Sequence, residues 1–277
     1  VGCASPPSEE QLPPETKWQP LIEADWSIEP GAEDYYCVRK TVEEDVWVRA
    51  FDSLSPPGTH HAVLTYGPPD GPDGLVACDS FENHDVMIYG SGVGSRPFAM
   101  PDGVAVRIPA GDQLLLNLHL FNATGETITG SSGVRYEALE DSAGYIEAQA
   151  ILMGPEELTI PPGDMSVKGT CTLAKDTTLF AVAPHMHQLG RHMTVTAKYD
   201  DESEILFDAA YDFEDQQITS LPQQVPLHAG DRIEVRCDYQ NNTGNTVVWG
   251  ESTLAEMCFA GVYRYPRDPN AFFVCFE

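Results

Sequence analysis

The chain has few basic residues. Its 277 residues include 15 Lys and Arg against 43 Asp and Glu, which gives a formal net charge of −28 at pH 7. Because such a charge repels phosphate backbones and anionic membrane surfaces, nucleic-acid binding is excluded as a function. The acidic residues are too numerous to mark a site, and we interpret most of them as a solvated surface.

Long apolar runs are also missing. No stretch approaches the ~18 to 20 apolar residues needed to span a bilayer, so we expect no transmembrane segment. No dozen residues keep apolar spacing at i, i+3, i+4 and i+7, which argues against amphipathic helices. Hydrophobic residues nevertheless make up 42% of the chain, enough for a globular protein with a real core.

Short alternating segments, separated by 23 Gly and 22 Pro, dominate the sequence and predict an all-β fold. Their spacing, with turns between them, predicts β-sandwiches. The segments richest in β-branched, aromatic or alternating apolar residues are Val46–Phe51, His61–Tyr66, Val104–Ile108, Leu114–Phe121, Leu179–Ala183, Met193–Tyr199 and Arg232–Tyr239.

A similar phrase, a short motif that ends in Gly-Asp, recurs next to predicted strands. Its Gly-Asp pair supplies a turn. It occurs as Ile108-Pro-Ala-Gly-Asp112, Ile160-Pro-Pro-Gly-Asp164 and His228-Ala-Gly-Asp231. We infer two related β units with a junction near residues 143–150. The expected organisation is a flexible tether (1–24), an N-terminal β-sandwich (25–146) and a C-terminal β-sandwich (147–277).

Seven cysteines leave one without a partner. Cys3 opens a Pro- and Glu-rich stretch that looks like a lipoprotein cleavage site, so it is a candidate for lipidation; a stray cysteine is the competing interpretation. The other six could form three disulfides by any of 15 connectivities. Since no CxxC pair is present, a zinc ribbon is disfavoured, and we expect an oxidising compartment: secreted, periplasmic or cell-surface.

His185 and His187 stand two residues apart on a predicted strand. Alternate residues of a strand project from the same face, so both imidazoles can reach one metal ion. The competing interpretation is a pair of hydrogen-bonded or exposed histidines.

His60 and His61 are adjacent, and neighbours in a regular strand face opposite ways. They can share a metal only at a strand end or bulge, for which Pro56-Pro57-Gly58 provides an irregular entry. His119 lies opposite the apolar face of its predicted strand; from the residues alone, a surface histidine is the stronger interpretation.

Most methionines fill gaps in the hydrophobic core, and this is the ordinary interpretation of Met257. Beside imidazoles, however, its thioether would be a soft ligand for reduced copper and would have little to offer magnesium, calcium or zinc. His84, His192 and His228 show no comparable pattern and are interpreted as surface residues, although His192 could support the His185/His187 pair.

Five short motifs follow one another along the chain and together resemble the copper type II ascorbate-dependent monooxygenase family, which includes peptidylglycine hydroxylating and dopamine β-monooxygenases. The resemblance runs from about residue 26 to residue 275. The motifs are Tyr35-Tyr36-Cys37, Thr59-His60-His61-Ala62-Val63-Leu64, Leu116-Asn117-Leu118-His119, Pro184-His185-Met186-His187-Gln188-Leu189-Gly190 and Glu256-Met257-Cys258.

The resemblance implies two jelly-roll-like antiparallel β-sandwiches that face each other across a solvent-filled cleft, with one copper ion on each. The copper that stores and delivers an electron would be held by His60, His61 and His119. The copper that binds dioxygen and attacks the substrate would be held by His185, His187 and Met257, which are the implied catalytic residues. The implied disulfides are Cys37–Cys78, Cys171–Cys275 and Cys237–Cys258.

The sequence departs from the peptidylglycine enzymes where they contact substrate. Where those enzymes carry an Arg, an Asn and a Tyr, this chain has Ala183, Phe259 and Gly261, respectively. Tyr35 keeps the residue type of the peptidylglycine enzymes. Without a charge-assisted partner for a peptide carboxylate, peptide amidation is disfavoured.

We therefore expect a monooxygenase with two copper ions per chain that hydroxylates an aliphatic C–H bond of an unidentified small-molecule substrate. Its co-substrates would be O2 and a one-electron reductant such as ascorbate. The competing hypotheses are a non-catalytic copper-binding or copper-buffering cell-surface lipoprotein and a structural β-sandwich protein.

Overall fold

The computed structural model describes residues 17–79, 82–140, 142–199 and 202–276. In these ranges the chain forms strands joined by turns and loops, with no α-helix, so the all-β prediction is confirmed. None of the described segments is a helix able to cross a membrane. The first strand begins at Gln19. Residues 19–24 therefore lie in a strand, whereas a tether was expected over residues 1–24. Cys3 lies outside the described residues.

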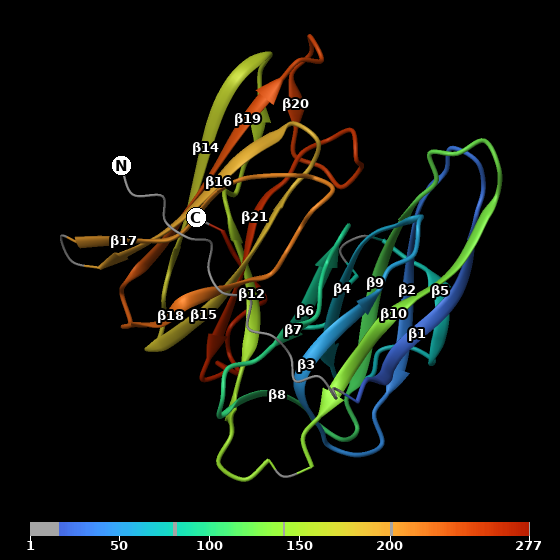
Figure 1. Cartoon of the computed structure of the whole chain (residues 1–277), viewed down its shortest axis with the longest axis vertical. Helices are drawn as coiled ribbons and strands as arrows, with labels where there is room; N and C mark the ends of the chain where they lie inside the picture. Colours follow the sequence, from blue (N-terminus) through green and yellow to red (C-terminus); the bar gives the residue numbers. More distant parts are fainter. Residues whose placement is uncertain (1–16, 80–81, 141, 200–201, 277) are drawn as a thin grey trace.

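Two sheets are built from the first half of the chain (Figure 1). One has the order β1-β10-β3-β8-β11, with β7 beside β3, and the other has the order β5-β2-β9-β4-β6. The strands are β1 (Gln19–Ile28), β2 (Glu33–Thr41), β3 (Val46–Leu54), β4 (Thr59–Gly67), β5 (Gly74–Ala77), β6 (Val86–Gly92), β7 (Phe98–Ala99), β8 (Val104–Ile108), β9 (Gln113–Phe121), β10 (Ile128–Ala138) and β11 (Ile146–Glu147).

Three sheets are built from the second half. Their orders are β18-β15-β21-β12-β22, β14-β19-β16-β17 and the short pair β13-β20. The strands are β12 (Gln149–Gly154), β13 (Thr159–Ile160), β14 (Gly163–Thr172), β15 (Thr177–Met186), β16 (Gly190–Tyr199), β17 (Glu202–Ala210), β18 (Thr219–Leu227), β19 (Arg232–Asn241), β20 (Val247–Val248), β21 (Cys258–Tyr265) and β22 (Val274–Phe276).

Each half packs its two large sheets around buried apolar side chains. In the first half, Val48 and Phe51 of β3 share a core with Leu64 and Leu116 of the other sheet. In the second half, residues of β15 and β21 share a core with residues of β16 and β19. The seven segments predicted as strands all lie within these strands. The alternation of apolar residues found them because each sheet buries at least one face.

The two halves are in direct contact. Phe98 of the first half lies 4.7 Å from Tyr263 and 6.2 Å from Phe180 of the second, measured between ring centroids. The Tyr263 hydroxyl accepts a hydrogen bond of 3.3 Å from the backbone N–H of Gly90. This apolar contact fixes how the sheets that carry the candidate ligands face each other.

Equivalent turns occur in both halves. Gly111, Gly163 and Gly230, the glycines of the recurring phrase, all have positive φ, which glycine adopts without steric cost. At the ends of β9 and β19, the amides of Asn122 and Asn241 donate matching hydrogen bonds to backbone carbonyls four residues ahead. The same local turn geometry therefore occurs in both halves of the chain.

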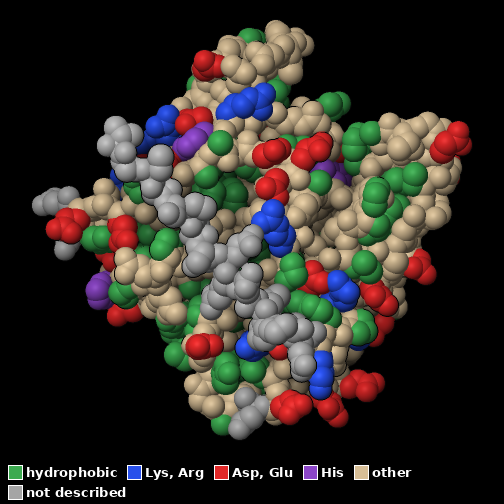
Figure 2. Space-filling model, in the orientation of Figure 1, with side chains coloured by type: hydrophobic (Ala, Val, Ile, Leu, Met, Phe, Trp, Pro, Cys, Tyr) green, Lys and Arg blue, Asp and Glu red, His purple; other side chains and the backbone are tan. Residues whose placement is uncertain are grey.

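Three disulfides join the cysteines in the pairs that the resemblance implies: Cys37–Cys78, Cys171–Cys275 and Cys237–Cys258. They are typical of an oxidising compartment. On the face shown in Figure 2, acidic side chains are spread over the surface and interspersed with Lys and Arg rather than gathered in one patch. This agrees with their interpretation as a solvated surface.

Candidate metal centre

Three imidazoles of the first half converge on one point. Strand β4 changes register against β9 between Thr59 and His61, so a bulge lets the adjacent residues His60 and His61 reach the same side. His119 on β9 pairs with His61 across the sheet. The Nδ1 atoms lie 3.0 Å apart for His60 and His61, 2.9 Å for His60 and His119, and 3.3 Å for His61 and His119.

The triad fits a metal ion better than a hydrogen-bonded cluster. Each Nδ1 has a single in-plane site, which holds either a hydrogen or a lone pair, so three mutual contacts cannot all be hydrogen bonds. Metal–imidazole bonds of about 2.0 to 2.1 Å, as for zinc, would hold three nitrogens roughly 3.4 Å apart. The observed separations are close to this spacing, so the three nitrogens can serve as one ligand set.

Burial keeps these imidazoles neutral, the form that binds metals. It lowers the pKa of His60 to about 2, and the neighbouring His119, His185 and His187 add to the effect. It also lowers the pKa of His119 to about 4, although Glu33 opposes the shift. The pKa of His61 is well below its ordinary value for the same reason.

Glu33 and Tyr35, both on β2, hold His119 in place. The Nε2–H of His119 donates to Glu33 Oε1 over 2.8 Å, which leaves the Nδ1 lone pair directed at the triad. The same carboxylate accepts bonds from Ser252 Oγ and the Thr253 N–H, both of the second half. Tyr35 stacks on the His119 ring with 4.3 Å between centroids. Glu33 therefore connects the first triad to the loop that precedes Met257.

His185, His187 and Met257 lie at one end of two neighbouring strands. Met186 pairs with Cys258 between β15 and β21, so the residues on either side of this pair are close together. The Nδ1–H of His185 donates to Gln216 Oε1 (2.8 Å), and the Nδ1–H of His187 donates to a backbone carbonyl (3.1 Å). Both rings are thereby left with a lone pair on Nε2.

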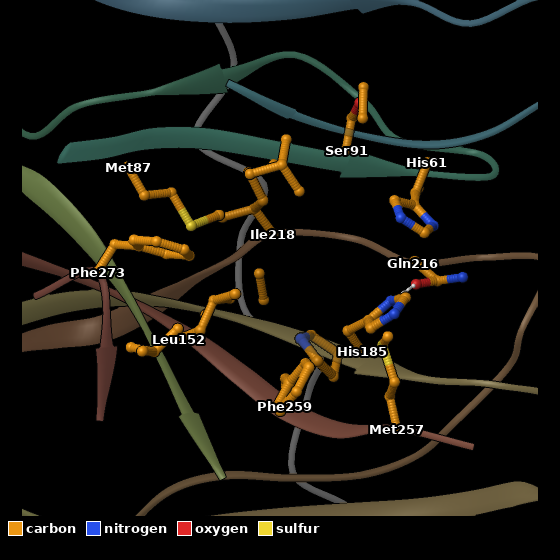
Figure 3. A pocket seen from close by; sticks show the side chains of 18 of the residues that line it. His61, Met87, Ser91, Leu152, His185, Gln216, Ile218, Met257, Phe259 and Phe273 are labelled. Atoms are coloured by element: carbon orange, nitrogen blue, oxygen red, sulfur yellow. Dashed lines mark hydrogen bonds between the residues drawn. The ribbon is translucent and has the colours of Figure 1, made fainter. Parts of the chain in front are cut away.

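The open Nε2 positions and a thioether could serve as a second ligand set. His187 Nε2 is buried and has no hydrogen-bond partner among the described residues. Burial lowers the pKa of His187 to about 3. Met257 is 8% exposed and points its sulfur toward His185 (Figure 3). Two neutral imidazoles and a thioether suit reduced copper.

Glu256 ties the two strands of this second set together. Its buried carboxylate accepts the backbone N–H groups of Leu189 (2.6 Å), His187 (2.9 Å) and Met257 (3.3 Å). Burial nevertheless raises its pKa to about 7. The Cys237–Cys258 disulfide anchors the same strand one residue beyond Met257.

The two ligand sets are adjacent rather than separated by a wide cleft. Ring centroids lie 5.4 Å apart for His61 and His185, and 6.1 Å apart for His60 and His187. The expectation of separate sites across solvent therefore differs from the structure. The halves also meet through Phe98 and Tyr263 and through Glu33 and Thr253.

Two histidines that were interpreted as surface residues from the residues alone are buried. His84 is buried at 7% exposure beneath Gly67 instead of on the surface. His119, for which a surface position was the stronger interpretation, is fully buried. His228 is exposed as predicted, and His192 is partly exposed beside Asp208 and Asp238.

A cavity of about 380 Å³ adjoins both ligand sets. His61, His185 and Met257 line it, together with apolar side chains of both halves (Figure 3). The positions that depart from the peptidylglycine enzymes, Ala183, Phe259 and Gly261, also lie in its wall, as does Tyr35.

Sequence reasoning did not find Glu33, Gln216 or the role of Glu256. Glu256 stands in a quoted motif but had no assigned function. Glu33 occupies an alternate position to Tyr35 on β2, which puts both on one face; among 43 acidic residues this was too weak a signal. Gln216 lies in the connection between β17 and β18, where no periodic pattern applies.

Comparison with known proteins identifies the family. Residues 143–277 match the model of the C-terminal domain of copper type II ascorbate-dependent monooxygenases. The chain is 28% identical over 234 residues to DBH-like monooxygenase protein 1 of Mus musculus, and 28% identical over 223 residues to the protein of the same name in Homo sapiens. These alignments cover 74% and 72% of the chain, but only 37% and 35% of the relatives, so the chain spans well under two thirds of their length. The second half of the chain therefore belongs to the copper type II ascorbate-dependent monooxygenase family, and the chain as a whole is similar to DBH-like monooxygenases.

Proposed function

We propose that the protein binds two copper ions, one through His60, His61 and His119 and one through His185, His187 and Met257. The mutual approach of three Nδ1 atoms supports the first assignment. The unpartnered Nε2 of His187 and the orientation of Met257 support the second. Copper bound there would supply the one-electron redox chemistry that activates dioxygen.

The proposed reaction is hydroxylation of an aliphatic C–H bond. Its balance is substrate-H + O2 + two electrons + two protons, giving substrate-OH + H2O, with each electron supplied by a one-electron donor such as ascorbate. The protein fixes the protons of its ligands: Glu33 holds the Nε2–H of His119, and Gln216 holds the Nδ1–H of His185. The apolar cavity wall excludes water from the reacting C–H bond.

The cavity beside His185 and Met257 is the observation that carries this proposal. A protein that only stores copper needs ligands but no enclosed space next to them. A volume of about 380 Å³ is within the range of small-molecule sites. We also propose that the two sheet systems are separate domains that meet near residue 147, and that the protein works outside the cytosol.

Oxygen consumption coupled to product formation tests the function. Copper-loaded protein is incubated with ascorbate and a panel of neutral apolar compounds, and hydroxylated products are identified by mass spectrometry with 18O2. We expect one 18O atom in the product. Copper-free protein and a Met257→Ile variant are the controls. Copper binding without labelled product from any compound would favour the copper-buffering alternative.

A further inference from the structure

The cavity beside the candidate metal centre has an apolar end and a polar end. In Figure 3, Met87, Leu152 and Phe273 lie at one end, and Ser91, His61 and His185 lie at the other. The aromatic ring of Phe259 adjoins the path between them. A bound molecule can therefore bury an apolar body at the first end and present its other end to the imidazoles.

The cavity exists because two small residues face each other in adjacent strands. Ala183 of β15 pairs with Gly261 of β21. A Cβ built on Gly261 would lie 3.3 Å from the Ala183 Cβ and 3.7 Å from Leu152 Cδ2, both from residues in the cavity wall. A larger side chain at residue 261 would thus occupy the space available to a ligand.

No cationic side chain lines the cavity among the described residues. The lining contains neither Lys nor Arg. Its one carboxyl group belongs to Glu251, whose Oε1 is buried without a hydrogen-bond partner. Burying a ligand carboxylate or phosphate here is unfavourable, because no cationic side chain of the described wall pairs with the charge.

The polar atoms that remain favour a hydroxyl group. Ser91 Oγ and Asn83 Oδ1 line the cavity, are buried and have no hydrogen-bond partner among the described residues. The Asn83 oxygen accepts hydrogen bonds, and the Ser91 hydroxyl both accepts and donates, so a neutral O–H group satisfies either one. A neutral ligand with one hydroxyl group would match both ends of the cavity.

We propose that the cavity binds a largely apolar molecule that carries no carboxylate, phosphate or sulfate group, with its apolar body among Met87, Leu152 and Phe273. This substrate class rests on the proposed function of the same site. It follows from a lining without Lys or Arg and from the unpartnered Ser91 Oγ and Asn83 Oδ1, and it limits the substrate to compounds whose polar groups are uncharged or donate hydrogen bonds.

Binding to copper-free protein tests this class separately from catalysis. Isothermal titration calorimetry compares 4-phenylbutan-1-ol with 4-phenylbutyrate, which has a similar apolar body and a carboxylate. Salt at about 0.5 M screens the long-range repulsion from the acidic protein. We expect the alcohol to bind at least tenfold more tightly. Equal or tighter binding of 4-phenylbutyrate would overturn the proposal.

Gly261→Leu locates the binding. The substitution should weaken the binding of 4-phenylbutan-1-ol at least tenfold. Ala210→Leu, at an exposed position of β17, should leave this affinity unchanged. Leu152→Trp is the second variant if Gly261→Leu does not fold. Unchanged affinity in a folded cavity variant would contradict the proposal. Tight binding of the alcohol without turnover would instead contradict only the monooxygenase function.

Discussion

Glu33→Gln should weaken copper binding at the first triad without unfolding the protein. The carboxylate accepts bonds from His119 Nε2 (2.8 Å), Thr253 N (2.9 Å) and Ser252 Oγ (3.0 Å). An amide oxygen can keep the first two bonds, and Ser252 can accept from the new NH2 group. Since charge-assisted bonds become neutral, we expect a loss of about 1 to 2 kcal/mol in unfolding free energy.

The effect of Glu33→Gln on copper affinity should be larger than its effect on the free energy of unfolding. A carboxylate that accepts a ligand imidazole N–H raises the basicity of the opposite nitrogen, and removing such a partner costs roughly 10- to 100-fold in metal affinity. That is about 1.4 to 2.7 kcal/mol. Competition titration with the copper(I) chelator bicinchoninate measures it, in a His185→Ala/His187→Ala background that leaves only the first triad.

Glu23→Gln is the matched control because Glu23 is an exposed residue on β1. It should leave the affinity unchanged. If Glu33→Gln binds copper(I) within twofold of the parent, or if Glu23→Gln weakens binding equally, the orienting role assigned to Glu33 is wrong.

Three further changes have defined outcomes. Gln216→Leu removes the acceptor of His185 Nδ1–H and should lower copper affinity at the second ligand set by roughly 10- to 100-fold. The affinity is measured in a His60→Ala/His119→Ala background, and an unchanged value would exclude this role of Gln216. Acidification should destabilise the copper-free protein, because burial lowers the pKa of His60, His119 and His187 to about 2, 4 and 3, so below pH ~6.5 the unfolded chain binds protons that the folded chain does not. From pH 7.5 to 5.5 these three histidines should cost about 4 kcal/mol of unfolding free energy, and Glu256, whose burial raises its pKa to about 7, should offset about 2. Burial also lowers the pKa of His61 and His185, which adds to the loss, so urea unfolding should show a net loss of at least about 2 kcal/mol; a gain would refute the assignment. Cys237→Ala/Cys258→Ala opens a bond with a sequence separation of 21 and should cost about 3 kcal/mol in urea unfolding, whereas an unchanged midpoint would show that the bond adds nothing.

Local patterns in the sequence predicted the features that depend on neighbouring residues. The alternation in Leu114–Phe121 reflects one buried sheet face, and the glycines of the recurring phrase adopt the positive φ that a tight turn requires. The spacing of His185 and His187 predicted that their imidazoles lie close together, and their ring centroids are 5.4 Å apart at the end of β15. These features follow from strand geometry alone.

Long-range packing explains what the sequence did not predict. His119 was interpreted as a surface residue because its strand has one clean apolar face, yet β9 lies between β2 and β4 and its second face is also covered. Glu33 meets partners 86 and 220 residues away, at His119 and Thr253. The proximity of His61 to His185 depends on how the halves dock, for which the sequence offers no periodic signal.

The sulfur ligand is the most direct test of the copper assignment. X-ray absorption of the fully reduced, copper-loaded protein should show two copper ions per chain and a sulfur scatterer on one of them. Met257→Ile keeps an apolar side chain of similar size, so the fold should survive at a cost of less than about 1.5 kcal/mol. The variant should lose the sulfur signal and substrate hydroxylation, while the His60/His61/His119 site stays loaded and reducible by ascorbate. A sulfur signal and turnover that both persist in Met257→Ile would contradict the two-copper account.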